Sequence, residues 1–145
     1  MSVAGPPAIG RACRVHRFGP PEVIVLEDVT PPAPGAGDVL VRVKAAGVGP
    51  WDAWVRSGRS ALPQPLPLTL GADLAGVVVA VGPAVTSVAP GDAVFGVTNA
   101  RFTGSHADYE REDITDWAGG GLAFVTRRPV DPQGPHFSPV LAPAR

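Results

Sequence analysis

An alternation of apolar and polar side chains is the clearest pattern in the chain, and it lies in the segment DVLVRVKAAGV at residues 38–48. Valine occupies positions 39, 41 and 43 and alternates with Leu, Arg and Lys at positions 40, 42 and 44. Successive side chains of a strand point to opposite faces of a sheet. This period of two therefore predicts a strand with one apolar and one mostly polar face.

Two shorter runs rich in β-branched residues precede this segment, ACRVHRF at 12–18 and EVIVLEDV at 22–29. The turn-forming sequence Gly-Pro-Pro separates them, which is typical of two neighbouring paired strands. The next segment, PPAPGAGD at 31–38, predicts a loop.

One short helix is predicted in the segment PWDAWVRSG. Pro50 suits the first position of a helix, and Gly58 suits the position just past its end. Trp51, Trp54 and Val55 are spaced three and four residues apart, so they share one face of this helix.

Proline at positions 63, 65 and 67 removes backbone donors from residues 61–70 and predicts an extended loop there. Residues 74–81 (LAGVVVAV) form a continuous β-branched run and predict the most buried strand. Gly71 and Gly76 favour close backbone packing where the loop enters this strand. A last short strand is predicted at 92–97, after a Pro-Gly-Asp turn.

These short strands and one small helix predict a mainly β fold, either a barrel or a sandwich. Residues 1–10 are expected to form a flexible N-terminus. Beyond residue 109 the chain becomes acidic (EREDITDW) and then proline-rich, and no period of 2 or 3.6 is sustained. We therefore expect a weakly structured, disordered tail at 110–145, with at most one helical turn near 108–117.

Length and charge narrow the classes of function. A chain of 145 residues is long enough for one domain. Its net charge of −1 offers no cluster of cations for nucleic acid or an anionic membrane. No apolar stretch approaches the ~20 residues that a membrane helix needs, and the N-terminus lacks a signal-peptide pattern. These features predict a cytoplasmic protein.

Three phrases in order, RVHRFGPPEVIVLEDVTPPAPGAGDVLVRVKAAGVGPWDAWVRSG, PLTLGADLAGVVVAVG and VTSVAPGDAVFGVTNARFTGSHADY, carry a family resemblance. They resemble the N-terminal, GroES-like (alcohol dehydrogenase-like) half of medium-chain dehydrogenase/reductases, in the zinc-independent, quinone oxidoreductase-like branch. The resemblance defines a domain at 11–109 and lapses after Tyr109. It implies a partly open β-barrel that forms one wall of an active-site cleft, with a separate Rossmann domain supplying NADPH.

The cofactor half of such an enzyme has no counterpart in the sequence. A dinucleotide-binding fingerprint needs Gly-x-Gly-x-x-Gly directly after a strand, and no segment qualifies. We therefore expect this chain alone to bind no cofactor and to transfer no hydride, and NADPH is implied by the resemblance only. A truncated gene, a frameshift product and a genuine short protein would all give this sequence.

Metal binding is not expected either. Zinc-dependent relatives place a Cys ligand at the position of Gly49 and a His-Glu pair at Ala72 and Asp73, and neither Gly nor Ala can coordinate a metal. Cys13 and His16 are three residues apart on a predicted strand and so face opposite sides.

The resemblance assigns no catalytic residue, but it implies five positions for substrate binding: Gly49, Asp52, Trp54, Asp73 and Thr98. Relatives usually carry Asn and Tyr at the first and third of these positions, so this chain has lost two polar groups. Structural alternatives stay open. Asp52 can favour the amides of the first helical turn, Asp73 can satisfy backbone donors, and Trp51 and Trp54 can form the buried face of the helix.

Three hypotheses about partners remain. In the first, a separate Rossmann-domain partner completes an enzyme that acts on an apolar carbonyl or quinone-like substrate. In the second, the chain is a stand-alone barrel that binds a small apolar ligand or a protein through the Trp51/Trp54 surface. In the third, the chain is a gene fragment. A barrel without its second half should expose apolar surface and an unpaired strand edge near 92–103, and should therefore self-associate.

Overall fold

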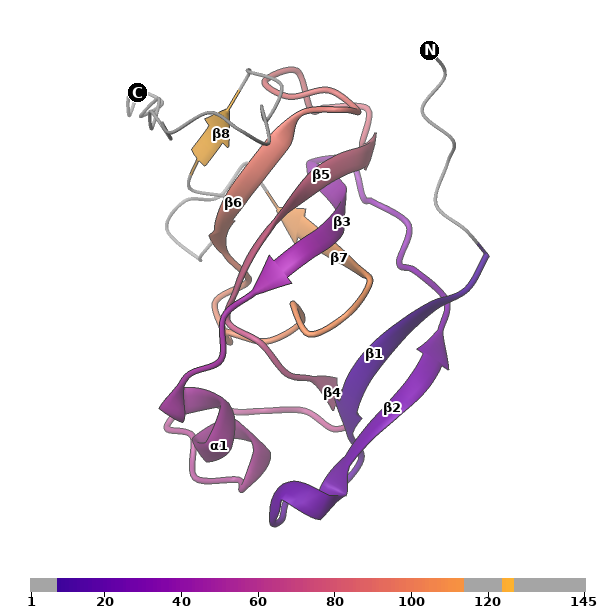
Figure 1. Ribbon diagram of the computed structural model, residues 1–145. Helices are drawn as coiled ribbons and strands as arrows, with labels where there is room; N and C mark the ends of the chain where they lie inside the picture. Colours follow the sequence, from indigo (N-terminus) through magenta and orange to yellow (C-terminus); the bar gives the residue numbers. More distant parts are fainter. Residues whose placement is uncertain (1–7, 114–123, 127–145) are drawn as a thin grey trace, which may run out of the picture.

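The computed structural model describes residues 8–113 and 124–126, and its elements are labelled in Figure 1. In chain order they are β1 (Gly10–Val15), the 3-10 helix η1 (Pro21–Val23), β2 (Ile24–Val29), β3 (Asp38–Ala46), α1 (Pro50–Arg56), β4 (Leu68–Thr69), β5 (Asp73–Val81), β6 (Ala93–Val97), β7 (Tyr109–Asp113) and β8 (Phe124–Thr126). The mainly β class with one short α-helix, predicted from the sequence, is confirmed for this part of the chain.

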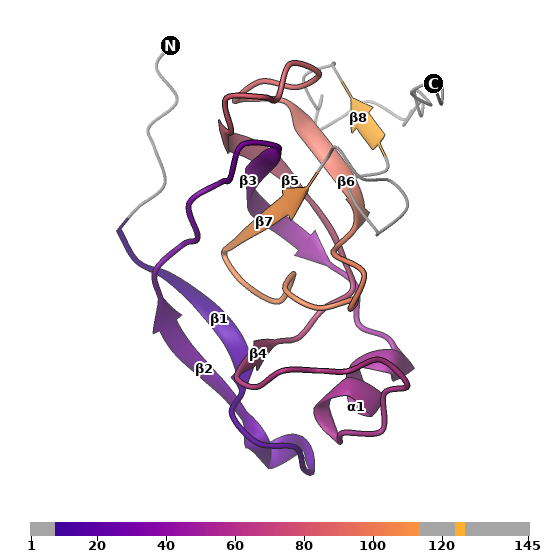
Figure 2. The same cartoon turned by 180° about the vertical axis from the view of Figure 1, so that it is seen from behind.

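The strands form two antiparallel sheets that do not close into a barrel (Figures 1 and 2). The smaller sheet has the order β2-β1-β4, and the larger one has the order β7-β3-β5-β6-β8. The helix α1 lies beside the smaller sheet, in the connection between β3 and β4.

The alternating valines of β3 build the core of the larger sheet. Val39 and Val41 are fully buried and pack in one cluster with Val78 of β5. Burial of a valine or leucine side chain contributes roughly 1.5–3 kcal/mol. The buried cluster consists of Val39, Val41, Leu74, Val78, Val88 and Val94.

A second core lies under α1, where Val55 packs with residues of the smaller sheet and its flanking segments. This cluster consists of Val15, Val23, Val55, Leu68 and Leu70. The buried residues of the helix are Asp52 and Val55.

The prediction that the two tryptophans form the buried face of the helix is wrong, because Trp51 is 42% and Trp54 53% exposed. The Asp52 carboxylate accepts hydrogen bonds from the amides of Gly49 and Gly71, and Asp52 and Val55 are the buried residues of the helix. Successive helical residues are rotated by about 100°, so Trp54 points away from Asp52. Trp51, one turn before Val55, lies at the edge of the buried face.

The segment 104–108 joins the two sheets. The Cys13 N–H donates to the His106 carbonyl at 2.8 Å, and the Asp108 N–H donates to the Arg11 carbonyl at 2.8 Å. The His106 N–H donates to the Leu70 carbonyl, also at 2.8 Å. The connection between β6 and β7 therefore lies against both β1 and the segment that enters β5.

The strand β7 departs from the expected tail. Residues 109–113 pair with Asp38–Arg42 of β3, where the sequence predicted at most a helical turn near 108–117. A strand forms because β3 offers a free antiparallel edge, and this partner is remote in sequence.

The short strand β8 is a second departure. Residues 124–126 pair with Ala93–Phe95 of β6. The prediction of an unpaired strand edge near 92–103 is therefore wrong for residues 93–95. The other residues of the predicted tail, and residues 1–7, lie outside the described part of the chain.

Backbone geometry around β4 explains two further features. Leu68 and Thr69 pair with β1 although 61–70 was predicted to be a loop, because they follow the last proline and keep their backbone donors. Gly71 has a φ of +102°, and a side chain at Gly76 would collide with the backbone of β3. The predicted close packing at these two glycines is confirmed.

Candidate functional site

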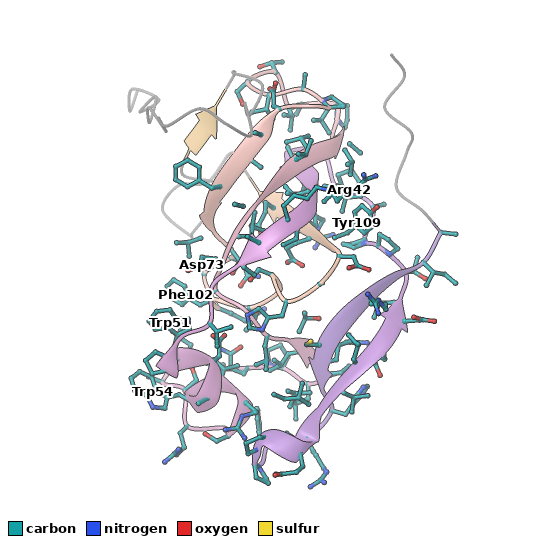
Figure 3. The ribbon with its side chains drawn as sticks, viewed as in Figure 1. Arg42, Trp51, Trp54, Asp73, Phe102 and Tyr109 are labelled. Carbon is teal, nitrogen blue, oxygen red and sulfur yellow. The ribbon has the colours of Figure 1, made fainter. Side chains whose placement is uncertain are left out.

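The candidate site is built around the Gly47 loop, residues 47–49, which connects β3 to α1. Figure 3 shows Asp73, Phe102, Trp51 and Trp54 along the same side of the molecule. The side chains of Asp73 and His106, from two distant parts of the chain, contact the loop.

Asp73, the first residue of β5, fixes the Gly47 loop from one side. The Gly47 N–H donates to Oδ1 of Asp73 at 2.6 Å. On the other side, Nε2 of His106 lies 2.9 Å from the Gly47 carbonyl oxygen and donates to it in the tautomer with a hydrogen on Nε2. The Gly47 peptide group is thus held at both ends.

Asp52 connects the start of α1 to the entry of β5. Its Oδ2 accepts from the Gly49 N–H at 2.8 Å, and its Oδ1 accepts from the Gly71 N–H at 3.2 Å. The residue is 6% exposed, so its carboxylate is committed to the backbone. Hydrogen bonds to a charged group typically contribute about 1.5–3 kcal/mol each.

Gly49 presents backbone rather than a side chain, because a Cβ at this position would overlap the indole of Trp51. Val48, Trp51 and Trp54 are 84%, 42% and 53% exposed and form what we call the aromatic surface. Exposed apolar patches of this kind commonly mark sites of binding.

The side chains of Thr98 and Asn99, just after β6, form hydrogen bonds with backbone groups of the chain. Thr98 is fully buried, and its hydroxyl donates to the Ala72 carbonyl at 3.1 Å. The Asn99 side chain donates to the Thr103 carbonyl at 2.7 Å and accepts from the Arg101 N–H at 2.9 Å. These contacts shape the turn after β6 and leave no Thr98 hydroxyl at the surface.

Of the five predicted site residues, Gly49 belongs to the Gly47 loop, and Asp52 and Asp73 accept hydrogen bonds from the loop's amides. Trp54 lies on α1, which follows the loop, and Thr98 is fully buried just after β6. Asp52 and Asp73 both accept hydrogen bonds from backbone amides, which is the structural alternative stated for each. Contact of any of the five residues with a substrate stays a prediction.

The N-terminus of α1 does not fit a cofactor pyrophosphate. A phosphate at a helix start needs free backbone N–H groups, but the Gly49 N–H is taken by the Asp52 carboxylate, which would also repel an anion. Residues 8–113 and 124–126 contain no group of three His, Cys, Asp or Glu arranged to hold a metal ion. The ring of His16 is hydrogen-bonded to Glu27 at 2.9 Å, and His136 lies outside the described residues.

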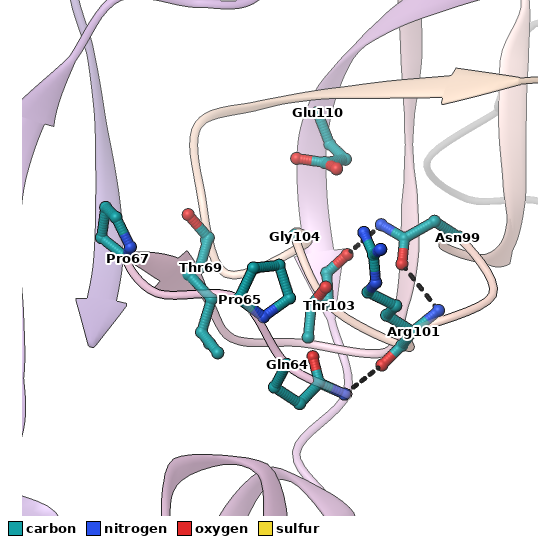
Figure 4. A pocket seen from close by; sticks show the side chains of 10 residues that line it. Gln64, Pro65, Pro67, Thr69, Asn99, Arg101, Thr103, Gly104 and Glu110 are labelled. Atoms are coloured by element: carbon teal, nitrogen blue, oxygen red, sulfur yellow. Dashed lines mark hydrogen bonds between the residues drawn. The ribbon is translucent and has the colours of Figure 1, made fainter. Parts of the chain in front are cut away.

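A separate cavity of about 240 Å³ lies between the loops 64–69 and 99–104 and below β7 (Figure 4). We call it the Glu110 cavity; it is lined by Gln64, Pro65, Pro67, Leu68, Thr69, Asn99, Arg101, Thr103, Gly104 and Glu110. None of the five predicted substrate-binding residues lines it.

Two carboxyl groups on β7 were missed from the sequence. Glu110 and Glu112 pair with Val41 and Val39, and directly paired residues share a face of the sheet, so both lie on the face that carries these buried valines. Glu110 lines the cavity, and Glu112 is fully buried. Burial raises the pKa of Glu110 to about 8. Burial, and then the charges of Glu110 and Asp38, raise the pKa of Glu112 to about 9. The available signal was the alternation Glu-Arg-Glu at the start of the acidic stretch.

Within the described part of the chain, no helix is long and apolar enough to cross a membrane.

Comparison with known proteins gives consistent matches. A family model for the alcohol dehydrogenase GroES-like domain matches residues 35–131, so the likeness continues past Tyr109. A quinone oxidoreductase from Sus scrofa is 46% identical over 128 residues, which cover 79% of this chain and 38% of that protein. The chain spans only 30–39% of the first curated relatives that it matches.

Solved structures agree with the sequence relatives. The quinone oxidoreductase from Coxiella burnetii superimposes with a TM-score of 0.68 at 30% identity, over 73% of this chain and 35% of that one. The Escherichia coli quinone oxidoreductase complexed with NADPH gives a TM-score of 0.64 at 32% identity, over 70% of this chain and 30% of that one.

Proposed function

This chain belongs to the alcohol dehydrogenase GroES-like domain family, and we propose that it forms the substrate side of an NADPH-dependent, zinc-independent quinone oxidoreductase-like protein. The observation that carries the proposal is the aromatic surface beside the Gly47 loop, which is fixed by hydrogen bonds, in a chain whose relatives include quinone oxidoreductases. Trp51 and Trp54 offer flat apolar faces on which a quinone ring can stack.

The residues of this chain bind and orient the substrate. NADPH, held by a portion outside these residues, would supply the hydride. Asp73 and His106 keep the Gly47 peptide in one orientation, and Asp52 fixes the start of α1, so the aromatic surface is presented without rearrangement. Such preorganisation lowers the entropy cost of binding.

The cofactor-binding portion is an expected partner. It would dock beside the aromatic surface and supply the groups for the pyrophosphate that α1 cannot offer. Without that portion we expect no hydride transfer, exposed apolar surface and self-association. A cytoplasmic location also stays part of this proposal.

An enzyme assay tests the need for a second portion. NADPH oxidation is measured with duroquinone as acceptor, for this chain alone and after mixing with the separately produced cofactor-binding portion of the Escherichia coli relative. We expect no turnover by the chain alone, and turnover in the mixture that falls with Trp54→Ala. Turnover by the chain alone would contradict the proposal.

A stand-alone binding domain is the second candidate, because the same exposed tryptophans would serve it. Durene has the shape of duroquinone without its carbonyl groups, so it separates the two functions. If durene and duroquinone bind equally well and no mixture shows turnover, the binding function is favoured.

A further inference from the structure

Phe102, in the turn after β6, has a backbone φ of +58°, which lies in the left-handed region. Residues with a side chain rarely adopt this region, and a bulky residue there is a true outlier. Glycine or asparagine would adopt it at lower cost. Burial of the ring does not offset the cost, because Phe102 is 43% exposed and belongs to neither core cluster. Stability alone would therefore favour a smaller residue at this position.

Hydrogen bonds on both sides of Phe102 hold the turn in this conformation. The Phe102 N–H donates to the Asn99 carbonyl at 2.9 Å. The Asn99 side chain accepts from the Arg101 N–H at 2.9 Å and donates to the Thr103 carbonyl at 2.7 Å. Nε2 of Gln64 donates to the Arg101 carbonyl at 3.1 Å (Figure 4). A strained residue that its surroundings fix in this way is typical of a binding site.

The turn after β6 and the Gly47 loop leave the same end of the larger sheet. Val97, the last residue of β6, pairs with Asp73, whose carboxylate accepts from the Gly47 N–H. In the view of Figure 3, Phe102 lies between Asp73 and Trp51. Val97 and Phe102 are both exposed. They therefore add two apolar side chains to the end of the sheet that carries the aromatic surface.

The chemistry of these two side chains is apolar. Val97 and Phe102 carry no hydrogen-bonding group, so they can recognise only an apolar part of a substrate. A quinone ring stacked on Trp51 and Trp54 carries its substituents at its rim, and a flexible alkyl substituent can extend from there to another segment of the chain. Each methylene group that becomes buried raises the affinity by about fourfold.

We propose that Phe102 is a specificity-determining residue of the proposed quinone site, where its ring contacts an alkyl substituent of a quinone stacked on Trp51 and Trp54. The site therefore favours a quinone that carries an alkyl chain over a quinone that carries methyl groups alone. This role rests on the proposed function, because it needs a quinone on the aromatic surface.

The test is a ¹H–¹⁵N NMR titration of the whole chain with two quinones that differ in one substituent, duroquinone and 2-n-butyl-3,5,6-trimethyl-1,4-benzoquinone. We expect the butyl compound to bind about tenfold more tightly, because its additional methylene groups are partly buried against Phe102. The butyl compound should also shift the backbone amides of residues 97–103, which duroquinone should leave unchanged.

Phe102→Asn removes the ring and introduces a residue that tolerates the left-handed backbone. This variant should lose the tenfold difference between the two quinones and bind duroquinone as before. Leu26→Asn, at an exposed apolar position on β2, is the matched control and should keep the difference. The melting temperature of Phe102→Asn should equal or exceed that of the unmodified chain, because the substitution relieves backbone strain.

The outcomes separate this role from the proposed function. If duroquinone does not bind, the proposed function fails and the role of Phe102 fails with it. If duroquinone binds but the butyl compound binds no more tightly, or if Phe102→Asn keeps the difference, only the role of Phe102 is overturned. A lower melting temperature of Phe102→Asn, with weaker binding of both quinones, would show that Phe102 is a structural residue and would also overturn that role.

Discussion

Two pairs of carboxyl groups in this protein meet opposite conditions. Asp52 and Asp73, beside the Gly47 loop, accept hydrogen bonds from backbone amides at 2.6–3.2 Å. Glu110 and Glu112, on β7, lie on the sheet face that carries buried valines, and Oε1 of Glu112 is buried without a partner among the described residues. The first pair holds the backbone around the Gly47 loop in place. The second pair raises the free energy of the folded state when it is ionised, and its oxygen atoms can accept a proton.

The pKa values of the second pair set the sign of a pH effect. The folded-state values of about 8 and 9 lie above the ordinary value of 4.5, so the folded chain holds more protons than the unfolded chain in between. The free energy of unfolding should therefore be highest below about pH 4.5 on account of these groups, and should fall as the pH rises through 8 to 9.

The largest expected effect comes from removing the better-bonded carboxylate. Asp52→Ala leaves the amides of Gly49 and Gly71 without their acceptor, and we expect the free energy of unfolding to fall by about 3 kcal/mol. Urea unfolding at pH 7 measures it. Asp28→Ala, at an exposed position on β2, is the matched control. A loss at Asp52 no larger than in the control would remove the contrast between the two pairs.

A smaller change of opposite sign is expected on β7. At pH 8 the Glu112 carboxyl, whose pKa is raised to about 9, must take up a proton when the chain folds. Glu112→Gln removes this cost, so the free energy of unfolding at pH 8 should rise by roughly 2 kcal/mol. At pH 5 the difference should be much smaller, because this pH lies close to the ordinary carboxyl pKa of 4.5. Urea unfolding at both pH values measures this, with the exposed Glu22→Gln as control. A loss of stability at pH 8 would show that Glu112 has an ionic partner.

The smallest effect on stability is expected at the aromatic surface. Trp54 is 53% exposed and belongs to neither core cluster, so Trp54→Ala should change the free energy of unfolding by no more than about 0.5 kcal/mol. Val55→Ala, a truncation at the adjacent buried position, should cost about 1–3 kcal/mol in the same urea experiment. Equal losses in the two variants would mean that Trp54 is a core residue.

Local pattern was sufficient for the elements with strong periodicity. The alternating valines predicted β3, the continuous β-branched run predicted β5, and Pro50 and Gly58 bounded α1 closely. The strand β7 was missed because its inward positions carry glutamates, which an apolar pattern cannot reveal. Its pairing with β3, like that of β8 with β6, is made between segments far apart in sequence.

The candidate site was predictable only in part. The family resemblance directed attention to the Gly47 loop region, and the structural alternatives for Asp52 and Asp73 anticipated their backbone bonds. The exposure of Trp51 and Trp54 was not predictable, since it depends on how the Asp52 carboxylate holds α1. The Glu110 cavity was missed because two remote loops create it.

Binding of a quinone to the aromatic surface is the central claim, and NMR mapping tests it most directly. We expect duroquinone, titrated into the ¹⁵N-labelled chain, to shift the indole N–H signals of Trp51 and Trp54 and the backbone amides of the Gly47 loop, and Trp54→Ala to weaken these shifts. Shifts confined to the Glu110 cavity, or no shift at the aromatic surface at saturating duroquinone, would contradict the claim.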